Sequence, residues 1–301
     1  MAQYLPLRIE ADGLETLDLS SGAITVSKLD LGDAVTRAVA SDAPGADGSI
    51  DTTMFTGARV VTMEALVRGS LSATSTRWAL TQRLRAFTNP RLRPRLYFRF
   101  SLVDPELMVT LRRAQFTDRW VPSANRETDS VVVQWVCPSG ILESAALLES
   151  TVFPGADVSS GLEFGASLEF GPSLEFPLVD PPGVGPVVNS GDRDAMPVVR
   201  AYGPFGDEGN AADVTTIGNV TSGLALSFVG MGVAAGDYLE IDFRRKTILV
   251  NGLSSQSRYS YLSFPSSAWW TLQPGVSVVS FRPDTFSGNS QMLTLWRDAY
   301  N

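Results

Sequence analysis

The chain has 301 residues, 44% of them hydrophobic and 19% charged, and its formal net charge of −8 argues against a general nucleic-acid binder. It contains no histidine and a single cysteine, Cys137, which excludes the commonest general base, the commonest metal ligand and an internal disulfide framework. It also lacks an apolar run of roughly 18 residues, so no transmembrane helix is expected, and its first residues lack the pattern of a signal peptide.

The first 150 residues predict a mainly β domain, because apolar and alternating runs of strand length recur along them. The predicted strands cover residues 58–68, 95–100, 107–111 and 130–137. The turn-rich residues 41–51 predict a long loop, and the acids in it lack the regular spacing of a calcium site.

One helix is predicted between the first two of these strands. Leu80, Leu84 and Phe87 recur at helical spacing, Ser75 is a candidate N-cap, and Asn89-Pro90 ends the pattern. A strand, a helix and then several strands are typical of an α+β domain with an antiparallel sheet or a small barrel.

Positive charge is concentrated in one segment. Between Arg77 and Arg126 the chain has eleven arginines and three acidic residues, a local balance of +8 that leaves −16 for the rest. Such a band could bind phosphates or the carboxylates of a neighbouring copy. Arginine in place of lysine favours the second, because its planar fork binds carboxylates bidentately and loses its hydration more easily. We therefore expect a homo-oligomer without specific nucleic-acid binding. The candidate interface arginines are Arg77, Arg83, Arg85, Arg112 and Arg113.

The stretch GLEFGASLEFGPSLEFP, residues 161–177, repeats Leu-Glu-Phe three times at a spacing of six. In an extended chain an even spacing keeps the apolar side chains on one face and the glutamates on the other. A flexible tether would be rich in Gly and Ser and would not expose such side chains. We expect an extended arm whose apolar edge packs on protein, within a linker at residues 151–193 that joins two domains. The candidate interface residues of this arm are Leu162, Phe164, Leu168, Phe170, Leu174 and Phe176.

Residues 194–301 predict a second domain of short strands without a helix, which fits a β-sandwich or jelly roll. The predicted strands cover residues 197–202, 224–228, 237–243, 247–250, 276–281 and 292–296.

Three motifs in this second domain carry a family resemblance. They are GDYLEIDFRRKTILVNG at residues 236–252, SSAWWTLQPGVSVVSF at 266–281 and TLWRDAY at 294–300. They resemble the C-terminal domain of the siphophage distal tail protein family, and GSIDTTMFTGARVVTMEALVRG at residues 48–69 resembles its N-terminal part. The repeated Leu-x-Phe linker is similar to that of members from phages of actinobacteria, although here Glu fills a position where Thr or Ser is usual.

The resemblance implies an architecture and a place in a virion. An N-terminal, split-barrel-like α+β domain at residues 1–150 would form a hexameric ring, and a C-terminal galectin-like jelly-roll sandwich at residues 194–301 would project from it. The protein would be a structural component of the tail tip of a long, non-contractile-tailed bacteriophage, made in the cytoplasm of the host bacterium. Its partners would be the tail tube protein and the tail-associated, tail-fibre or receptor-binding proteins, with no membrane partner and no cofactor.

Two other function classes remain to be weighed. The C-terminal sandwich could recognise a cell-surface glycan, with Trp269 and Trp270 as the candidate stacking residues, or this pair could be one buried ring and one ring that covers a sheet edge. A glycosidase would need a rigid pair of carboxylates, and Glu163, Glu169 and Glu175 stand in a repeated linker, which is a poor place for one. We therefore predict no enzyme and no catalytic, cofactor-binding or metal-binding residue.

Overall fold

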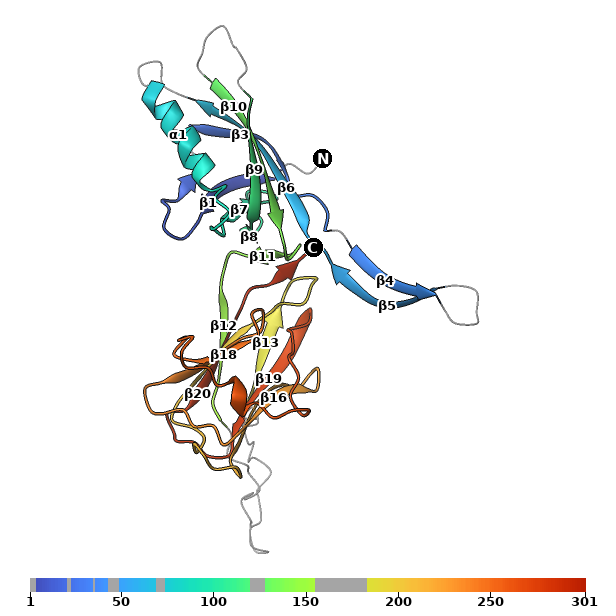
Figure 1. The fold of residues 1–301 in the computed structure, drawn as a ribbon, viewed down its shortest axis with the longest axis vertical. Helices are drawn as coiled ribbons and strands as arrows, with labels where there is room; N and C mark the ends of the chain where they lie inside the picture. The colour runs from blue at the N-terminus through green and yellow to red at the C-terminus, as the bar shows by residue number, and fades with distance from the viewer. Residues whose placement is uncertain are drawn as a thin grey trace, which may run out of the picture. The chain divides into compact units, whose positions relative to one another are not determined.

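The computed structural model describes residues 4–20, 23–34, 36–42, 49–68, 74–119, 128–154 and 183–301. The chain divides into two compact units (Figure 1): a first unit of Met1–Ala146 with Ala299–Asn301, and a second unit of Leu147–Asp298. Within the described residues there is one α-helix, α1 (Thr74–Ala86), and one 3₁₀ turn, η1 (Tyr259–Tyr261), which confirms the mainly β class. No helix of the described chain has the length and apolar character that a membrane crossing requires.

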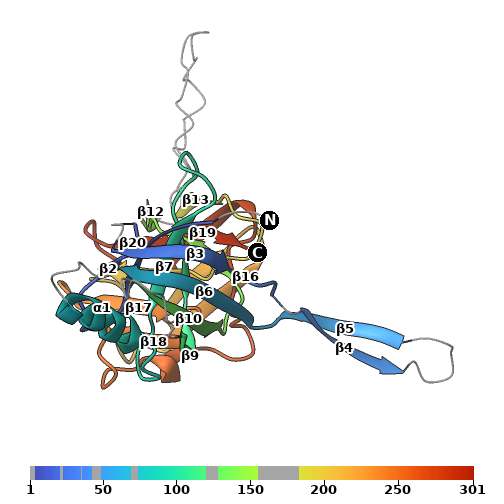
Figure 2. The ribbon, with the colours of Figure 1, turned by 90° about the horizontal axis from the view of Figure 1, so that it is seen from above.

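The first unit contains two larger antiparallel sheets and one separate hairpin (Figures 1 and 2). Strand order is β2-β1-β7-β8-β11-β21 in the six-stranded sheet and β3-β6-β10-β9 in the four-stranded sheet, while β4 and β5 pair with each other. The strands are β1 (Leu5–Glu10), β2 (Leu17–Asp18), β3 (Ile24–Asp30), β4 (Thr36–Asp42), β5 (Ser49–Thr56), β6 (Arg59–Arg68), β7 (Arg95–Arg99), β8 (Leu107–Thr110), β9 (Arg112–Arg119), β10 (Thr128–Cys137), β11 (Leu142–Ser144) and β21 (Ala299–Tyr300).

The core of this unit follows from the alternation in its central strands. In β6 every second residue is buried, and Val61, Met63 and Val67 are fully shielded from water. Trp135 of the neighbouring strand β10 is buried in the same cluster. Burial of each such side chain contributes roughly 1.5–3 kcal/mol, so these two strands supply much of the stability of the unit.

Helix α1 packs its apolar stripe on the four-stranded sheet. Leu84 and Phe87 are buried in the core and Leu80 is packed against it, as the helical spacing predicts. The helix begins at Thr74, so Ser75 lies in its first turn and not before it. It ends at Ala86, three residues before Asn89-Pro90.

The loop expected at residues 41–51 is shorter than predicted. Strand β4 continues to Asp42 and β5 begins at Ser49, so both ends of the expected loop belong to a hairpin. The two strands reach further into this polar stretch than propensity alone indicates, and residues 43–48 lie outside the described residues.

The second unit consists of two antiparallel sheets. The orders are β12-β20-β14-β17-β18 and β13-β19-β15-β16. The strands are β12 (Leu148–Val152), β13 (Val184–Asn189), β14 (Val198–Tyr202), β15 (Val214–Asn219), β16 (Leu224–Val229), β17 (Tyr238–Asp242), β18 (Thr247–Val250), β19 (Gly275–Pro283) and β20 (Gln291–Trp296). All six strands predicted here are present, whereas β12, β13 and β15 were not predicted.

Two side-chain hydrogen bonds connect the two sheets of the second unit. The Nε1 of Trp296, on β20, donates to the backbone oxygen of Val188 on β13 at 3.0 Å. The hydroxyl of Ser150, on β12, donates to the backbone oxygen of Pro186 on β13 at 3.0 Å. These bonds join one sheet to the other, and together with the buried side chains between them they make this unit a β-sandwich.

The expected interdomain linker has a different place in the fold. The backbone nitrogen of Gly183 donates to the oxygen of Phe153 at 3.0 Å, so the end of β12 and the start of β13 lie next to each other. Both strands belong to the second unit, which begins at Leu147. Residues 154–182 therefore connect two neighbouring strands of one unit, and not the two units. The repeated Leu-Glu-Phe stretch lies outside the described residues.

Candidate functional site

The three candidate arginines of α1 lie on one helix that carries no acidic residue in its sequence, TSTRWALTQRLRA. Arg83 forms an ion pair with Glu15 at 3.1 Å. The guanidinium of Arg85 is exposed and lies 4.9 Å from the centre of the Phe116 ring on β9. Arg77 is half-buried and has an interaction partner of its own. The helix thus presents a basic surface beside β9.

Arg112 and Arg113 lie at the start of β9, the edge strand of the four-stranded sheet. Both are exposed, and Arg113 has a left-handed backbone with φ 44°. The register of β9 against β10 shifts there, because Trp135 pairs with Ala114 and Val136 pairs with Arg112. This bulge turns the edge away from regular pairing, a common protection of edge strands, and it brings two arginines to the surface.

A charged network on the six-stranded sheet was not predicted from the sequence. Arg8 on β1 contacts Glu10 at 2.7 Å and Glu106 at 2.6 Å, and Arg99 reaches Glu106 at 3.6 Å. The Arg8 guanidinium also lies 4.0 Å from the centre of the Tyr97 ring. The predicted alternation in residues 95–100 places Tyr97 and Arg99 on one face, but the register that sets Arg8 opposite Tyr97 is a long-range feature.

The network shifts the pKa of its members in the directions that ion pairs require. Burial alone would raise the pKa of the Glu10 carboxyl, but hydrogen bonds from Arg8 and Tyr97 and the charge of Arg8 lower it. Burial alone would lower the pKa of Arg8, but its hydrogen bond to Glu10 and the charges of Glu106 and Glu10 raise it. Burial and the neighbouring Glu10 raise the pKa of Tyr97. These directions favour the charged forms of Arg8 and Glu10 and the neutral form of the Tyr97 hydroxyl, as a structural ion pair requires.

The net charge of the chain is confined to the second unit. By sequence, the first unit has 16 basic and 16 acidic residues and is neutral, while the second has 8 basic and 16 acidic residues and carries −8. Within the first unit the +8 band from Arg77 to Arg126 is matched by 5 basic and 13 acidic residues outside it, a remainder of −8. Equal and opposite charges on one unit favour contact between copies of that unit.

The two candidate stacking tryptophans have different environments. Trp270 is 2% exposed, its Nε1 donates to the oxygen of Ile217 at 3.5 Å, and its ring packs 4.1 Å from that of Phe243. Trp269 is half-buried, and its ring centre lies 5.4 Å from that of the same Phe243. Trp270 therefore offers no free ring face to a sugar, and the pair has the form of one core ring and one ring at its border.

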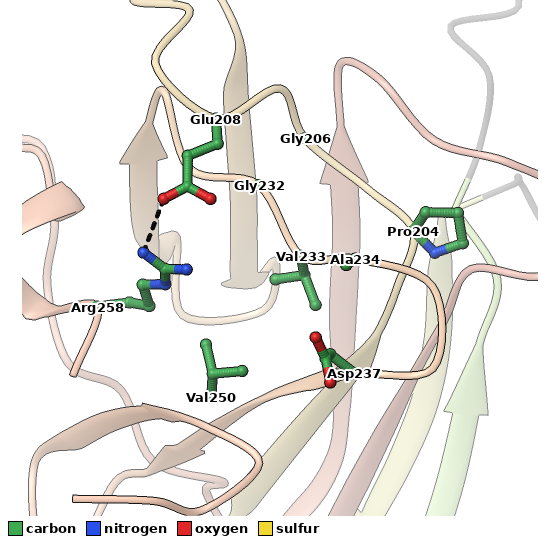
Figure 3. A pocket seen from close by; sticks show the side chains of 9 residues that line it. All are labelled: Pro204, Gly206, Glu208, Gly232, Val233, Ala234, Asp237, Val250 and Arg258. Atoms are coloured by element: carbon green, nitrogen blue, oxygen red, sulfur yellow. Dashed lines mark hydrogen bonds and ion pairs between the residues drawn. The ribbon is translucent and has the colours of Figure 1, made fainter. Parts of the chain in front are cut away.

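The second unit contains a cavity of about 470 Å³ (Figure 3). Arg258 and Glu208 point toward each other on one side of it and form an ion pair at 2.9 Å, and Asp237 lies across from them. Asp237 accepts a hydrogen bond from Asn251 at 2.7 Å. Both carboxylates thus have partners, and no aromatic ring is among the residues that line the cavity.

Glycines shape this cavity by letting two loops approach closely. Gly206 has φ 74°, and a Cβ there would collide with the backbone oxygen of Met231. A Cβ on Gly232 would lie 2.9 Å from the backbone nitrogen of Glu208. Reciprocal backbone hydrogen bonds of 3.1 and 2.9 Å between Phe205 and Val233 hold the two loops together. No group of three or more metal-ligating side chains occurs in the described part of the chain.

A comparison with known protein families finds a match that lies mostly in the second unit. Residues 207–300 match the siphovirus-type tail component, C-terminal domain, and this segment contains all three C-terminal motifs. This part of the chain is therefore similar to the siphovirus-type tail component family. No curated protein matches the sequence.

One solved structure extends the likeness, in fold, to both units. The crystal structure of the Dit protein of phage SPP1, described as a paradigm of the hub adsorption apparatus in phages that infect Gram-positive bacteria, is similar over 97% of this chain and 98% of its own, with a TM-score of 0.57 and 14% identity. Two structures of the phage P2 baseplate in its activated conformation, with calcium and with strontium, cover 98% of this chain and 97% of theirs at 9% identity, with TM-scores of 0.49 and 0.48. At 14% identity the likeness to Dit concerns the fold.

Proposed function

We propose that this tail component is a structural distal tail protein of a long, non-contractile-tailed bacteriophage. Its first unit forms a ring of six copies at the tail tip. The ring joins the tail tube protein to tail-associated, tail-fibre or receptor-binding proteins. The observation that carries the proposal is that a family match in the second unit and a fold likeness over both units point to the same kind of protein.

The first unit supports the ring part of the proposal through its charge. By sequence, its +8 band and its −8 remainder give each copy groups of opposite charge that can contact the next copy. A contact between two different surfaces of identical copies is head-to-tail, and such contacts close into rings when the rotation permits. The bulges in β3 and β9, the two edge strands of the four-stranded sheet, disfavour growth by strand addition, which leaves side-chain surfaces for association.

Light scattering on the purified full-length protein tests the proposal. We expect a higher oligomer at micromolar concentration and low salt that dissociates as salt is raised, because salt screens exposed ion pairs. A monomer at every concentration, also in the presence of the tail tube protein, would contradict the ring.

A second candidate function is carbohydrate recognition by the second unit. The cavity beside Glu208 and Arg258 favours carbohydrate recognition, since a glycan needs a concave polar site. The buried ring of Trp270 argues against it, because this ring has no face free for a sugar. A glycan array with the intact protein separates this function from a purely structural one. We also expect no polysaccharide cleavage, and turnover that disappears on changing one Asp or Glu would overturn that expectation.

A further inference from the structure

The loop between β7 and β8 exposes two large apolar side chains to solvent. Leu102 is 82% and Val103 is 93% exposed, the highest values among the large apolar side chains of the described residues. At the base of the loop the ring of Phe100 packs on Tyr4 at 5.2 Å. At its far end Glu106 is held by Arg8. The loop is anchored on both sides, so its apolar tip is a built feature of the surface.

One acidic residue accompanies this tip. The backbone nitrogen of Asp104 donates to the oxygen of Ser101 at 3.4 Å, which folds the loop into a turn. The other acid, Glu106, is engaged by Arg8 and Arg99. The tip therefore presents two apolar side chains and the carboxylate of Asp104.

Helix α1 presents the complementary chemistry. Trp78 is 66% exposed, although an indole ring of this size is usually buried. Arg85 is exposed and lies seven residues after Trp78. It is therefore on the same helix face as Trp78, roughly 10 Å further along the helix axis. Since the helix has no acidic residue, its outer face offers one large apolar ring and a positive charge.

We propose that the β7–β8 loop of one copy docks on the outer face of α1 in the next copy, with Leu102 and Val103 against Trp78 and Asp104 toward Arg85. The inference rests on the proposed ring and names the surfaces that close it. A second copy is the fitting occupant because both halves of the contact are on every copy and have opposite charge. The high exposure of Trp78 and Val103 shows that they do not cover each other within one copy.

Cross-linking between two single-cysteine variants tests the contact. Ala79→Cys, at an exposed site beside Trp78, and Val103→Cys are co-expressed with different tags, purified through both tags and treated with a short bismaleimide. We expect a cross-linked dimer that carries both tags, and little dimer from either variant alone. The native Cys137 is fully buried and stays unreactive. The matched control pairs Ala79→Cys with Leu253→Cys, a residue of the second unit that is 49% exposed, and should give no mixed dimer.

A charge exchange gives a second, independent readout by light scattering. Arg85→Glu and Asp104→Arg should each weaken association, and the double variant should regain part of it. Val103→Asp should weaken association about tenfold or more, because it places an unpaired carboxylate in an apolar contact. Leu253→Asp serves as its control and should have no effect.

The outcomes separate this inference from the proposed function. A ring that forms in the wild type without the mixed cross-link, and that survives Val103→Asp, overturns the inference and leaves the ring intact. Variants that assemble normally but no longer bind the tail tube protein also overturn it, since the loop then docks on the tube. A wild-type protein that never associates contradicts the proposed function itself.

Discussion

The two units of this chain differ in their charge and in the apolar side chains that they expose. The first unit is electrically neutral but divided into a +8 band and a −8 remainder, and its helix and its β7–β8 loop expose Trp78 and Val103. The second unit carries the whole net charge of −8, and its sheets are joined by internal hydrogen bonds from Trp296 and Ser150. Opposite charges within one unit favour contact between copies, whereas a net negative charge disfavours contact between copies of the second unit. We therefore propose that the first unit carries self-association.

If the units are independent, damage to the second should leave the first folded. Trp296→Ala removes a buried ring and the hydrogen bond from Nε1 to Val188, and should destabilise the second unit by about 3–5 kcal/mol. Trp296→Phe keeps most of the buried ring and should cost less. Denaturant unfolding followed by hydrogen exchange should show the loss in residues 147–298 alone. An equal loss in both units would mean that they unfold as one.

The reverse experiment uses a buried arginine of the first unit. Arg59 is 4% exposed, and its Nε donates to the backbone oxygen of Gly140 at 2.8 Å. Arg59→Ala leaves that buried carbonyl without its charged donor and should destabilise the first unit by about 2–3 kcal/mol. Val60→Ala, at a neighbouring residue that is 50% exposed, is the control and should be nearly silent. If the Arg59→Ala variant changed hydrogen exchange in the second unit instead, the two units would not be independent.

The Leu-Glu-Phe repeat tests whether the second unit uses a further apolar surface. Replacing Phe164, Phe170 and Phe176 together by Ser should destabilise the second unit or the oligomer. Burial of each ring contributes roughly 1.5–3 kcal/mol, most of which is offset by backbone ordering of roughly 1–2 kcal/mol per residue. Replacing Glu163, Glu169 and Glu175 by Thr should be almost silent. Thermal unfolding and light scattering measure both, and equal damage from the two triple variants would refute the assignment of faces.

The smallest expected effect concerns pH and the network of the first unit. The folded-state pKa of Glu10 is lowered below its ordinary value of 4.5, chiefly because the hydrogen bonds from Arg8 and Tyr97 outweigh burial. Its contribution to stability is therefore complete above pH 4.5 and is lost as the pH falls through the lower, folded-state pKa. Glu10→Gln should be less stable than the wild type at neutral pH, and the difference should shrink in acid. A difference that stays constant with pH would show that the carboxylate charge is not involved.

Some strands of this protein, but not β12, β13 or β15, can be predicted from its sequence because their periodicity is local. The alternation in β6 and the spacing of Leu80, Leu84 and Phe87 predict both the elements and their buried faces. The placement of residues 154–182 is not readable in this way, because the hydrogen bond from Gly183 to Phe153 depends on how β12 and β13 pack. A Pro- and Gly-rich stretch looks the same between two domains and between two strands of one domain.

The candidate surfaces also differ in how far the sequence alone predicts them. The arginine band is visible as composition, and the structure distributes it over a helix and an edge strand. The ion pair of Arg8 with Glu106 spans almost a hundred residues of sequence and requires the pairing of β1, β7 and β8. The exposure of Leu102 and Val103 could not be predicted, since two apolar residues in a turn are equally compatible with a small buried loop.

Electron microscopy of the purified full-length protein tests the central claim most directly. Class averages of particles prepared at low salt should show closed rings with six-fold symmetry, and Val103→Asp should convert most of them to single copies. Particles of one copy for the wild type, or open chains without a closed ring, would contradict the account of a ring-forming first unit.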